Sequence, residues 1–133
     1  MNKGTRARAF LIFCSVRLLP IALGYGAQPS FTLDALFGIS VETTNLTHIM
    51  RAVMGLYLGM VVFWLYGAFN SSVEGAALIG CAVFMLGLAS GRILSIALDG
   101  MPHWLLVVYA ALEILLGSTA IALYRGHTYS KKL

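Results

Sequence analysis

Four stretches of the chain are almost entirely apolar, and each is long enough to cross a lipid bilayer. They cover residues 9–25, 46–69, 75–98 and 102–124. An α-helix rises about 1.5 Å per residue and the hydrocarbon core of a bilayer is about 30 Å thick, so about 20 residues suffice. The first stretch is the shortest, and Pro20 inside it predicts a kink. The pattern predicts an all-α integral membrane protein, a four-helix bundle forming one domain over residues 1–133.

The connections between these stretches carry recognisable turn signals. Residues 70–74 form a short link, which makes the second and third spans antiparallel neighbours. Ser71 precedes Glu74 by three residues, the spacing of a capping box that would open the third span. Gly100 is placed to cap the end of that span, and Pro102 suits the first turn of the fourth.

The first connection, residues 26–45, is longer and has an apolar segment of its own. Within it, residues 30–37 include two phenylalanines and two leucines and are followed by Gly38. Amphipathic segments of this kind lie at the interface between lipid and water. We expect a short interfacial helix or a re-entrant lid in this first outer loop.

The composition and the charge distribution also favour a membrane protein. Only 11% of the 133 residues are charged and 59% are hydrophobic, whereas soluble domains carry about 25% charged residues. The basic residues outside the spans lie near the two chain ends, at Lys3, Arg6, Arg8, Arg125, Lys131 and Lys132. Segments rich in lysine and arginine stay in the cytoplasm, so both termini are predicted to be cytoplasmic. The formal charge of +4 does not indicate nucleic acid, because no aromatic residues alternate with a basic stripe.

The sequence lacks the motifs of familiar enzymes and metal sites. It has no CxxC pair, no cluster of metal ligands, no nucleophile elbow and no phosphate loop. Cys14 and Cys81 fall within spans, where cysteine behaves as a small hydrophobe, so free buried thiols are predicted. We expect no cofactor and no metal, and the sequence does not decide whether the protein is an enzyme.

Ionisable residues inside the apolar stretches are the strongest indication of function. Glu113 lies near the middle of the fourth span, and Arg17, Arg51 and Arg92 lie in the other three. Charged groups at such depth are costly unless a partner or water reaches them. With both termini cytoplasmic, the alternating direction of the spans places all four residues in the outer half or near the midplane. The sequence therefore predicts one polar layer that faces the interior of the bundle.

Helical spacing assigns a side to each of these residues. One side of the second span is small and polar and is predicted to face the bundle: His48, Arg51, Gly55 and Gly59. The opposite side is predicted to face lipid and comprises Val53, Tyr57, Met60 and Trp64. The aromatic residues expected at the edges of the bilayer are Tyr25, Trp64, Trp104 and Tyr124.

The deep charges do not balance within the chain. Three arginines face one deep carboxylate, with Asp99 nearer the outer edge. If Glu113 pairs with one arginine, another guanidinium lacks an anion at its depth. Arginine matches the geometry of carboxylate and phosphate, so a bound anionic group would complete the balance. The predicted ligand-binding residues are Arg17, His48, Arg51, Arg92, Ser95, Asp99, Tyr109 and Glu113.

Three functions remain open at this point. The first is an outward-facing pocket for a small or lipid-like ligand with an anionic or polar head, contacted by Arg51 and Arg92. The second is a membrane-embedded enzyme acting on a lipid-soluble substrate, with Glu113 or His48 moving a proton. The third is a structural or accessory subunit whose charged residues form an ion-pair network that sets the helix register. Association into a homo-oligomer is compatible with each of them, and the lipid bilayer is a partner in all three.

The order of motifs along the chain resembles that of a known family. Arg51-Ala is followed by Gly55-Leu-Tyr-Leu-Gly59 in the second span, Gly91-Arg92-x-x-Ser95-x-x-x-Asp99-Gly in the third and Glu113 in the fourth. This pattern is similar to that of the small bacterial four-span proteins catalogued as domain of unknown function 4345. The resemblance implies an integral protein of the bacterial cytoplasmic (inner) membrane. It draws attention to Arg51, Arg92, Ser95, Asp99 and Glu113, and it implies no activity.

Overall fold

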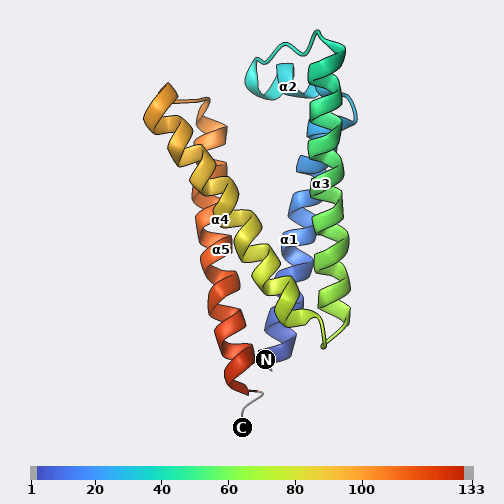
Figure 1. Ribbon diagram of the computed structural model, residues 1–133, viewed down its shortest axis with the longest axis vertical. Helices are drawn as coiled ribbons and strands as arrows, with labels where there is room; N and C mark the ends of the chain where they lie inside the picture. Colours follow the sequence, from blue (N-terminus) through green and yellow to red (C-terminus); the bar gives the residue numbers. More distant parts are fainter. Residues whose placement is uncertain (1–2, 131–133) are drawn as a thin grey trace.

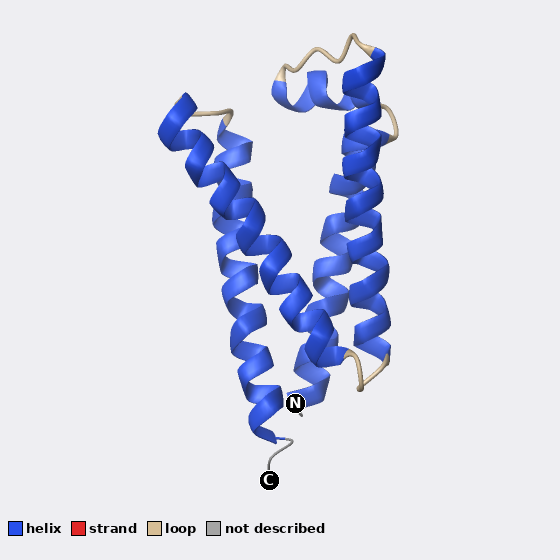
Figure 2. Ribbon diagram, in the orientation of Figure 1, coloured by secondary structure: helices blue, strands red, loops and turns tan. Residues whose placement is uncertain are grey.

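The computed structural model describes residues 3–130, with side chains described for residues 4–126. This part of the chain forms five α-helices and no strands (Figures 1 and 2). The helices are α1 (Lys3–Gly26), α2 (Pro29–Phe37), α3 (Thr44–Phe69), α4 (Glu74–Asp99) and α5 (Trp104–Ser130). Four of them, all but α2, are long and apolar enough to cross a membrane. The all-α class and the multi-pass membrane architecture predicted from the sequence are therefore confirmed.

The long helices extend beyond the apolar stretches that predict them. Helix α1 begins at Lys3, because residues 3–8 contain no helix breaker other than Gly4 and continue the helix ahead of the apolar run. It also runs without interruption through Pro20. Helix α3 begins at Thr44, where the side chain of Thr43 accepts a hydrogen bond of 3.2 Å from the backbone N–H of Leu46.

The apolar segment of the first connection is helical, as its pattern predicts. Pro29 occupies the first turn of α2, where its missing N–H has no partner to lose. Gly38 ends the helix in the left-handed conformation, with φ of 66°, and its N–H donates to the carbonyl of Asp34 at 2.8 Å. The side chain of Leu33 is 3% exposed, so α2 is packed onto the rest of the molecule.

Two of the predicted turn signals act differently from the expectation. Ser71 does not cap α4, because Val73 directly precedes that helix and makes no side-chain cap. The turn is instead organised by Asn70, whose Oδ1 accepts from the backbone N–H of Ser72 at 3.1 Å. Pro102 likewise lies before α5 rather than in its first turn. Gly100 does cap α4, with φ of 96° and an N–H donated to the carbonyl of Ile96.

The four long helices form two arms. Helix α1 packs along α3, and α4 packs along α5, more extensively than any other pair of helices. The arms are close together at the end that holds both termini and diverge toward the other end (Figure 1). Small residues allow the close approach: a Cβ added to Gly67 would collide with Ala77, and one added to Gly117 would lie 2.6 Å from Leu86.

The core lies where the arms converge and is filled by large side chains. The indole of Trp64 is fully buried, as are the side chains of Leu11 and Leu78. The ring of Phe84 packs edge-on against Trp64 and Tyr57, with centroid separations of 5.6 and 5.1 Å.

The side of α3 that faces the bundle is opposite to the one predicted. Tyr57 is 6% exposed and Trp64 is fully buried, whereas the side bearing His48, Arg51, Gly55 and Gly59 is exposed. The physical reason is volume, since the core between the two arms needs bulky aromatic rings, which small residues cannot replace. Trp64 is therefore a core residue and does not belong to an interfacial belt.

The two cysteines behave as predicted. Cys14 of α1 and Cys81 of α4 are both free and fully buried. Their thiols are neighbours in the region where α1 crosses α4.

Candidate functional site

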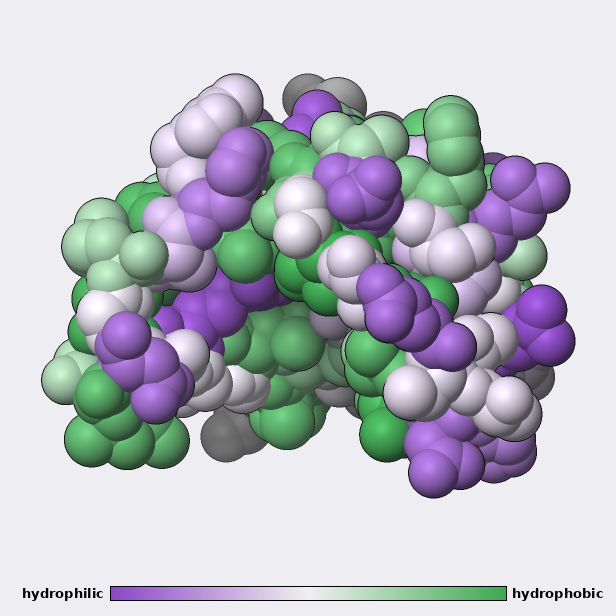
Figure 3. Space-filling view, turned by 90° about the horizontal axis from the view of Figure 1, so that it is seen from above, coloured by the Kyte–Doolittle hydropathy of each residue, from purple (hydrophilic) through white to green (hydrophobic). Residues whose placement is uncertain are grey.

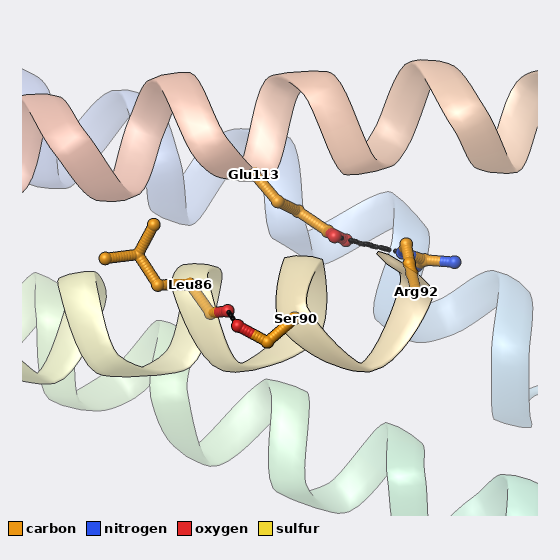
Figure 4. Close-up of polar contacts among 4 residues, drawn as sticks. All are labelled: Leu86, Ser90, Arg92 and Glu113. Atoms are coloured by element: carbon orange, nitrogen blue, oxygen red, sulfur yellow. Dashed lines mark hydrogen bonds and ion pairs between the residues drawn. The ribbon is translucent and has the colours of Figure 1, made fainter. Parts of the chain in front are cut away.

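An ion pair joins α4 to α5 in the diverging half of the molecule. The Nε–H of Arg92 donates to both carboxylate oxygens of Glu113, at 3.1 and 2.9 Å (Figure 4). Glu113 is 8% exposed, so the pairing satisfies a carboxylate that would otherwise be buried alone. The sequence predicts that Glu113 needs an arginine partner, and the structure identifies that partner as Arg92.

The remainder of the Arg92 guanidinium is turned away from this carboxylate. In Figure 4 the terminal nitrogens lie on the far side of the guanidinium from Glu113. The Cζ atom of Arg92 lies 5.8 Å from the centre of the Tyr109 ring, and the phenol of Tyr25 approaches the same guanidinium from α1. Arg92 makes no ion pair other than that with Glu113 among the described side chains. Arg92 also lines two of the cavities described next, so its side chain borders the space between the arms.

Three adjoining cavities occupy this space. The largest, about 450 Å³, is bounded by α1, α2 and α5. A deeper cavity of about 60 Å³ lies against Arg92 and Glu113, and a third of about 220 Å³ lies between Arg92 and α2. Tyr109 lines the first two and Tyr25 the first and third, so the three cavities are neighbours. The largest falls within the range of about 300–1,000 Å³ that is usual for small-molecule sites.

The surface at the open end of the molecule combines polar and apolar parts. Seen from above, the space between the arms is hollowed, and hydrophilic atoms appear on one wall amid mainly apolar surface (Figure 3). The lining of the largest cavity is mostly apolar and includes Val16, Ile21 and Leu36. A largely apolar cavity with a few polar groups at one end is the usual form of a site for an amphipathic molecule.

Helix α2 forms a roof over the cavities. Phe37 at its C-terminal end packs edge-on against Tyr109 and His103, with centroid separations of 6.5 and 6.1 Å. Because α2 is also packed on α1 and α3, Phe37 bridges the two arms above the ion pair.

Arg17 is a second arginine of the same site. It lines both the largest and the deepest cavity, and Tyr109 lies near both Arg17 and Arg92. Its Cζ atom lies 5.9 Å from the centre of the Phe13 ring. Among the described side chains no carboxylate pairs with Arg17.

Half of the predicted site residues lie apart from the ion pair and the cavities. His48 and Arg51 lie on the exposed side of α3 and do not line the three cavities described above. Ser95 donates a hydrogen bond of 2.9 Å to Asp99, and both lie exposed near the end of α4. The polar layer is therefore built by α1, α4 and α5, and the prediction that α3 contributes an arginine to it is not met.

Three aromatic residues of the site were not among those predicted. Tyr25 follows Arg17 by about two helical turns and so points to a similar side of α1, a signal that the sequence does carry. Tyr57 lines the deepest cavity on the side of α3 expected to face lipid. Phe37 has no such signal, because its position depends on how α2 folds back over the bundle.

The chemistry available here is the binding of a polar or anionic group. No group of three or more His, Cys, Asp or Glu side chains that could hold a metal ion occurs within the described residues. The donors that line the cavities include the guanidinium groups of Arg17 and Arg92 and the phenols of Tyr25 and Tyr109, and the Tyr25 phenol also contacts Arg92. Charge-assisted hydrogen bonds from arginine are among the stronger ones in proteins.

Comparisons with known proteins agree with the motif pattern. Neither a search of curated proteins nor a search of solved structures found a match to this chain. A family model described as domain of unknown function (DUF4345) matches residues 6–124, which include all four membrane-spanning helices almost entirely. The protein therefore belongs to the DUF4345 family.

Proposed function

We propose that this protein binds a small or lipid-like ligand with an anionic or polar head in the cavity between its two arms. It would lie in the bacterial cytoplasmic membrane with both termini in the cytoplasm. Supporting this orientation, Arg6, Arg8 and Arg125 flank the end of the molecule that holds the termini. The cavity would then open outward, with α2 at the outer interface.

The observation that carries this proposal is that Glu113 accepts hydrogen bonds from the Nε–H of Arg92 alone. Its Nε–H is held by Glu113, while the terminal nitrogens lie on the other side of the guanidinium and the side chain lines two of the cavities. Glu113 thus acts as a positioning residue that fixes the guanidinium, and Arg92 contacts the ligand. Tyr25 and Tyr109 also line the cavities and would donate further hydrogen bonds.

The arrangement favours binding over a purely register-setting network. The ion pair lies within one arm and does not connect the two arms. A network that only fixes packing would leave no deep guanidinium unmatched, yet Arg17 has no carboxylate among the described side chains. A membrane-embedded enzyme is the second candidate, because Glu113, a group able to move protons, lines the deepest cavity.

Native mass spectrometry after gentle extraction tests the binding function. The wild-type protein is expected to retain a small molecule that Arg92→Gln loses. Arg51→Gln is the matched control, because it makes the same chemical change on the exposed side of α3 and should retain the molecule as the wild type does. Equal retention by Arg92→Gln and Arg51→Gln would contradict the proposal.

A further inference from the structure

The ionisable groups around the cavity leave one positive charge unmatched. Among the described residues, Arg17, Arg92 and Glu113 are the charged side chains that line the three cavities. Two guanidinium groups and one carboxylate give a net charge of one positive unit. Because Arg92 and Glu113 neutralise one another, the unmatched charge lies at Arg17.

The side chain with the unmatched charge lines the same cavity as Arg92. Both arginines line the deepest cavity, and both lie near the ring of Tyr109. A single anionic group bound in that cavity would therefore have both arginine side chains in its lining. Such an anion would also remove the cost of leaving Arg17 unpaired at membrane depth.

The space next to this charge suits one apolar chain. The cavity of about 450 Å³ begins at Arg17 and continues along Val16, Pro20 and Ile21 of α1 and Leu36 of α2. Its polar contributions come from Arg17, Tyr25, Thr32 and Tyr109. A fully charged or sugar-like molecule would leave its polar groups unsatisfied against this wall.

We infer that the ligand is a single-chain amphiphile whose head carries one negative charge, held between Arg17 and Arg92, with its chain in the apolar cavity under α2. This inference rests on the proposed function and specifies its ligand. A fatty-acid carboxylate and the phosphodiester of a lysophospholipid share this chemistry.

The test compares probes of equal chain length in the full-length protein, extracted in a neutral detergent. The probes are laurate, 1-lauroyl-lysophosphatidylglycerol and neutral 1-lauroylglycerol, titrated by native mass spectrometry. The two anionic probes should differ from each other according to which head the site prefers, and at least one should bind about tenfold or more tightly than the neutral probe.

Variants at position 17 test whether Arg17 causes the preference for an anionic head. Arg17→Gln should remove the preference for the anionic probe, so that the variant binds the anionic probe and 1-lauroylglycerol with similar affinity. Arg17→Lys keeps the charge and should keep most of the preference, and Arg51→Gln should behave as the wild type. Arg17 is exposed and makes no ion pair with a described side chain, so both substitutions at this position are expected to fold.

The outcomes separate the inference from the function on which it rests. Equal binding of anionic and neutral probes, or a preference that survives Arg17→Gln, overturns the monoanionic head while leaving a ligand-binding cavity in place. Failure of all three probes to bind, together with equal retention of native material by Arg92→Gln and wild type, overturns both.

Discussion

Phe37 of α2 packs edge-on against Tyr109 of α5, with ring centroids 6.5 Å apart and ring planes at 80°. This contact joins the end of the roof to the arm that carries the ion pair. Edge-to-face aromatic pairs contribute about 0.5–1.5 kcal/mol beyond the area they bury. The roof is therefore joined to the second arm by a weak contact, which would suit the admission of the proposed ligand.

The first prediction concerns this contact. Phe37→Ala should increase the rate of hydrogen–deuterium exchange across residues 29–37, because the roof loses its attachment to the second arm. The melting temperature should change little, since the core between the arms is untouched. Phe31→Ala is the control, because Phe31 is 72% exposed and its loss should not change the exchange. Similar exchange in the two variants would show that Phe37 does not hold the roof.

The second prediction concerns the ion pair. Arg92→Gln or Glu113→Gln alone should lower the free energy of unfolding by about 3 kcal/mol, because each leaves a partly buried charge without its partner. The double variant should lose clearly less than the sum of the two, and denaturant unfolding in mixed micelles measures all three. If the two losses simply add, the residues do not interact in the folded protein.

The third prediction compares two glycines of α3. Gly67→Ala should destabilise the protein by about 1–3 kcal/mol, because the added methyl group collides with Ala77 where α3 meets α4. Gly55→Ala meets open space and should be neutral or stabilising by up to about 1 kcal/mol. Thermal unfolding of the two variants in the same detergent provides the measurement. Equal effects would mean that the helices do not approach closely at Gly67.

The fourth prediction concerns thiol reactivity. Cys14 and Cys81 are fully buried, so a maleimide should label neither of them until the protein unfolds. Ser40→Cys provides the comparison, because Ser40 is exposed in the connection between α2 and α3 and the new thiol should react at once. Rapid labelling of the wild-type protein would place at least one native cysteine outside the core.

The residues that the sequence located correctly share a simple physical constraint. A carboxylate in the middle of an apolar span must find a partner, which identifies Glu113 and restricts the choice to a few arginines. Helix termini with Gly100 and Gly38 were equally readable, because a left-handed or similarly unusual backbone conformation favours glycine. These inferences depend on the free-energy cost of a buried charge or an unusual backbone conformation. That cost is local, so the inferences hold for almost any packing of the helices.

The orientation of α3 could not be read in the same way. Polarity alone places Arg51 and His48 inside, but the interior of this bundle needs the volume of Tyr57 and Trp64. The arms diverge, and that shape depends on all four helices together. The same holds for Phe37, whose partners Tyr109 and His103 lie more than sixty positions away along the chain.

Because Arg92 and Glu113 lie within one arm, their ion pair does not depend on the angle between the two arms. A wider angle between the arms would part Phe37 from Tyr109 and Tyr25 from Arg92, but the carboxylate would keep its counter-ion throughout. Opening of the arms would therefore cost aromatic packing and the contact of Tyr25 with Arg92, but not the ion pair. Entry or exit of the proposed ligand would therefore not expose a bare carboxylate to the acyl chains around the protein.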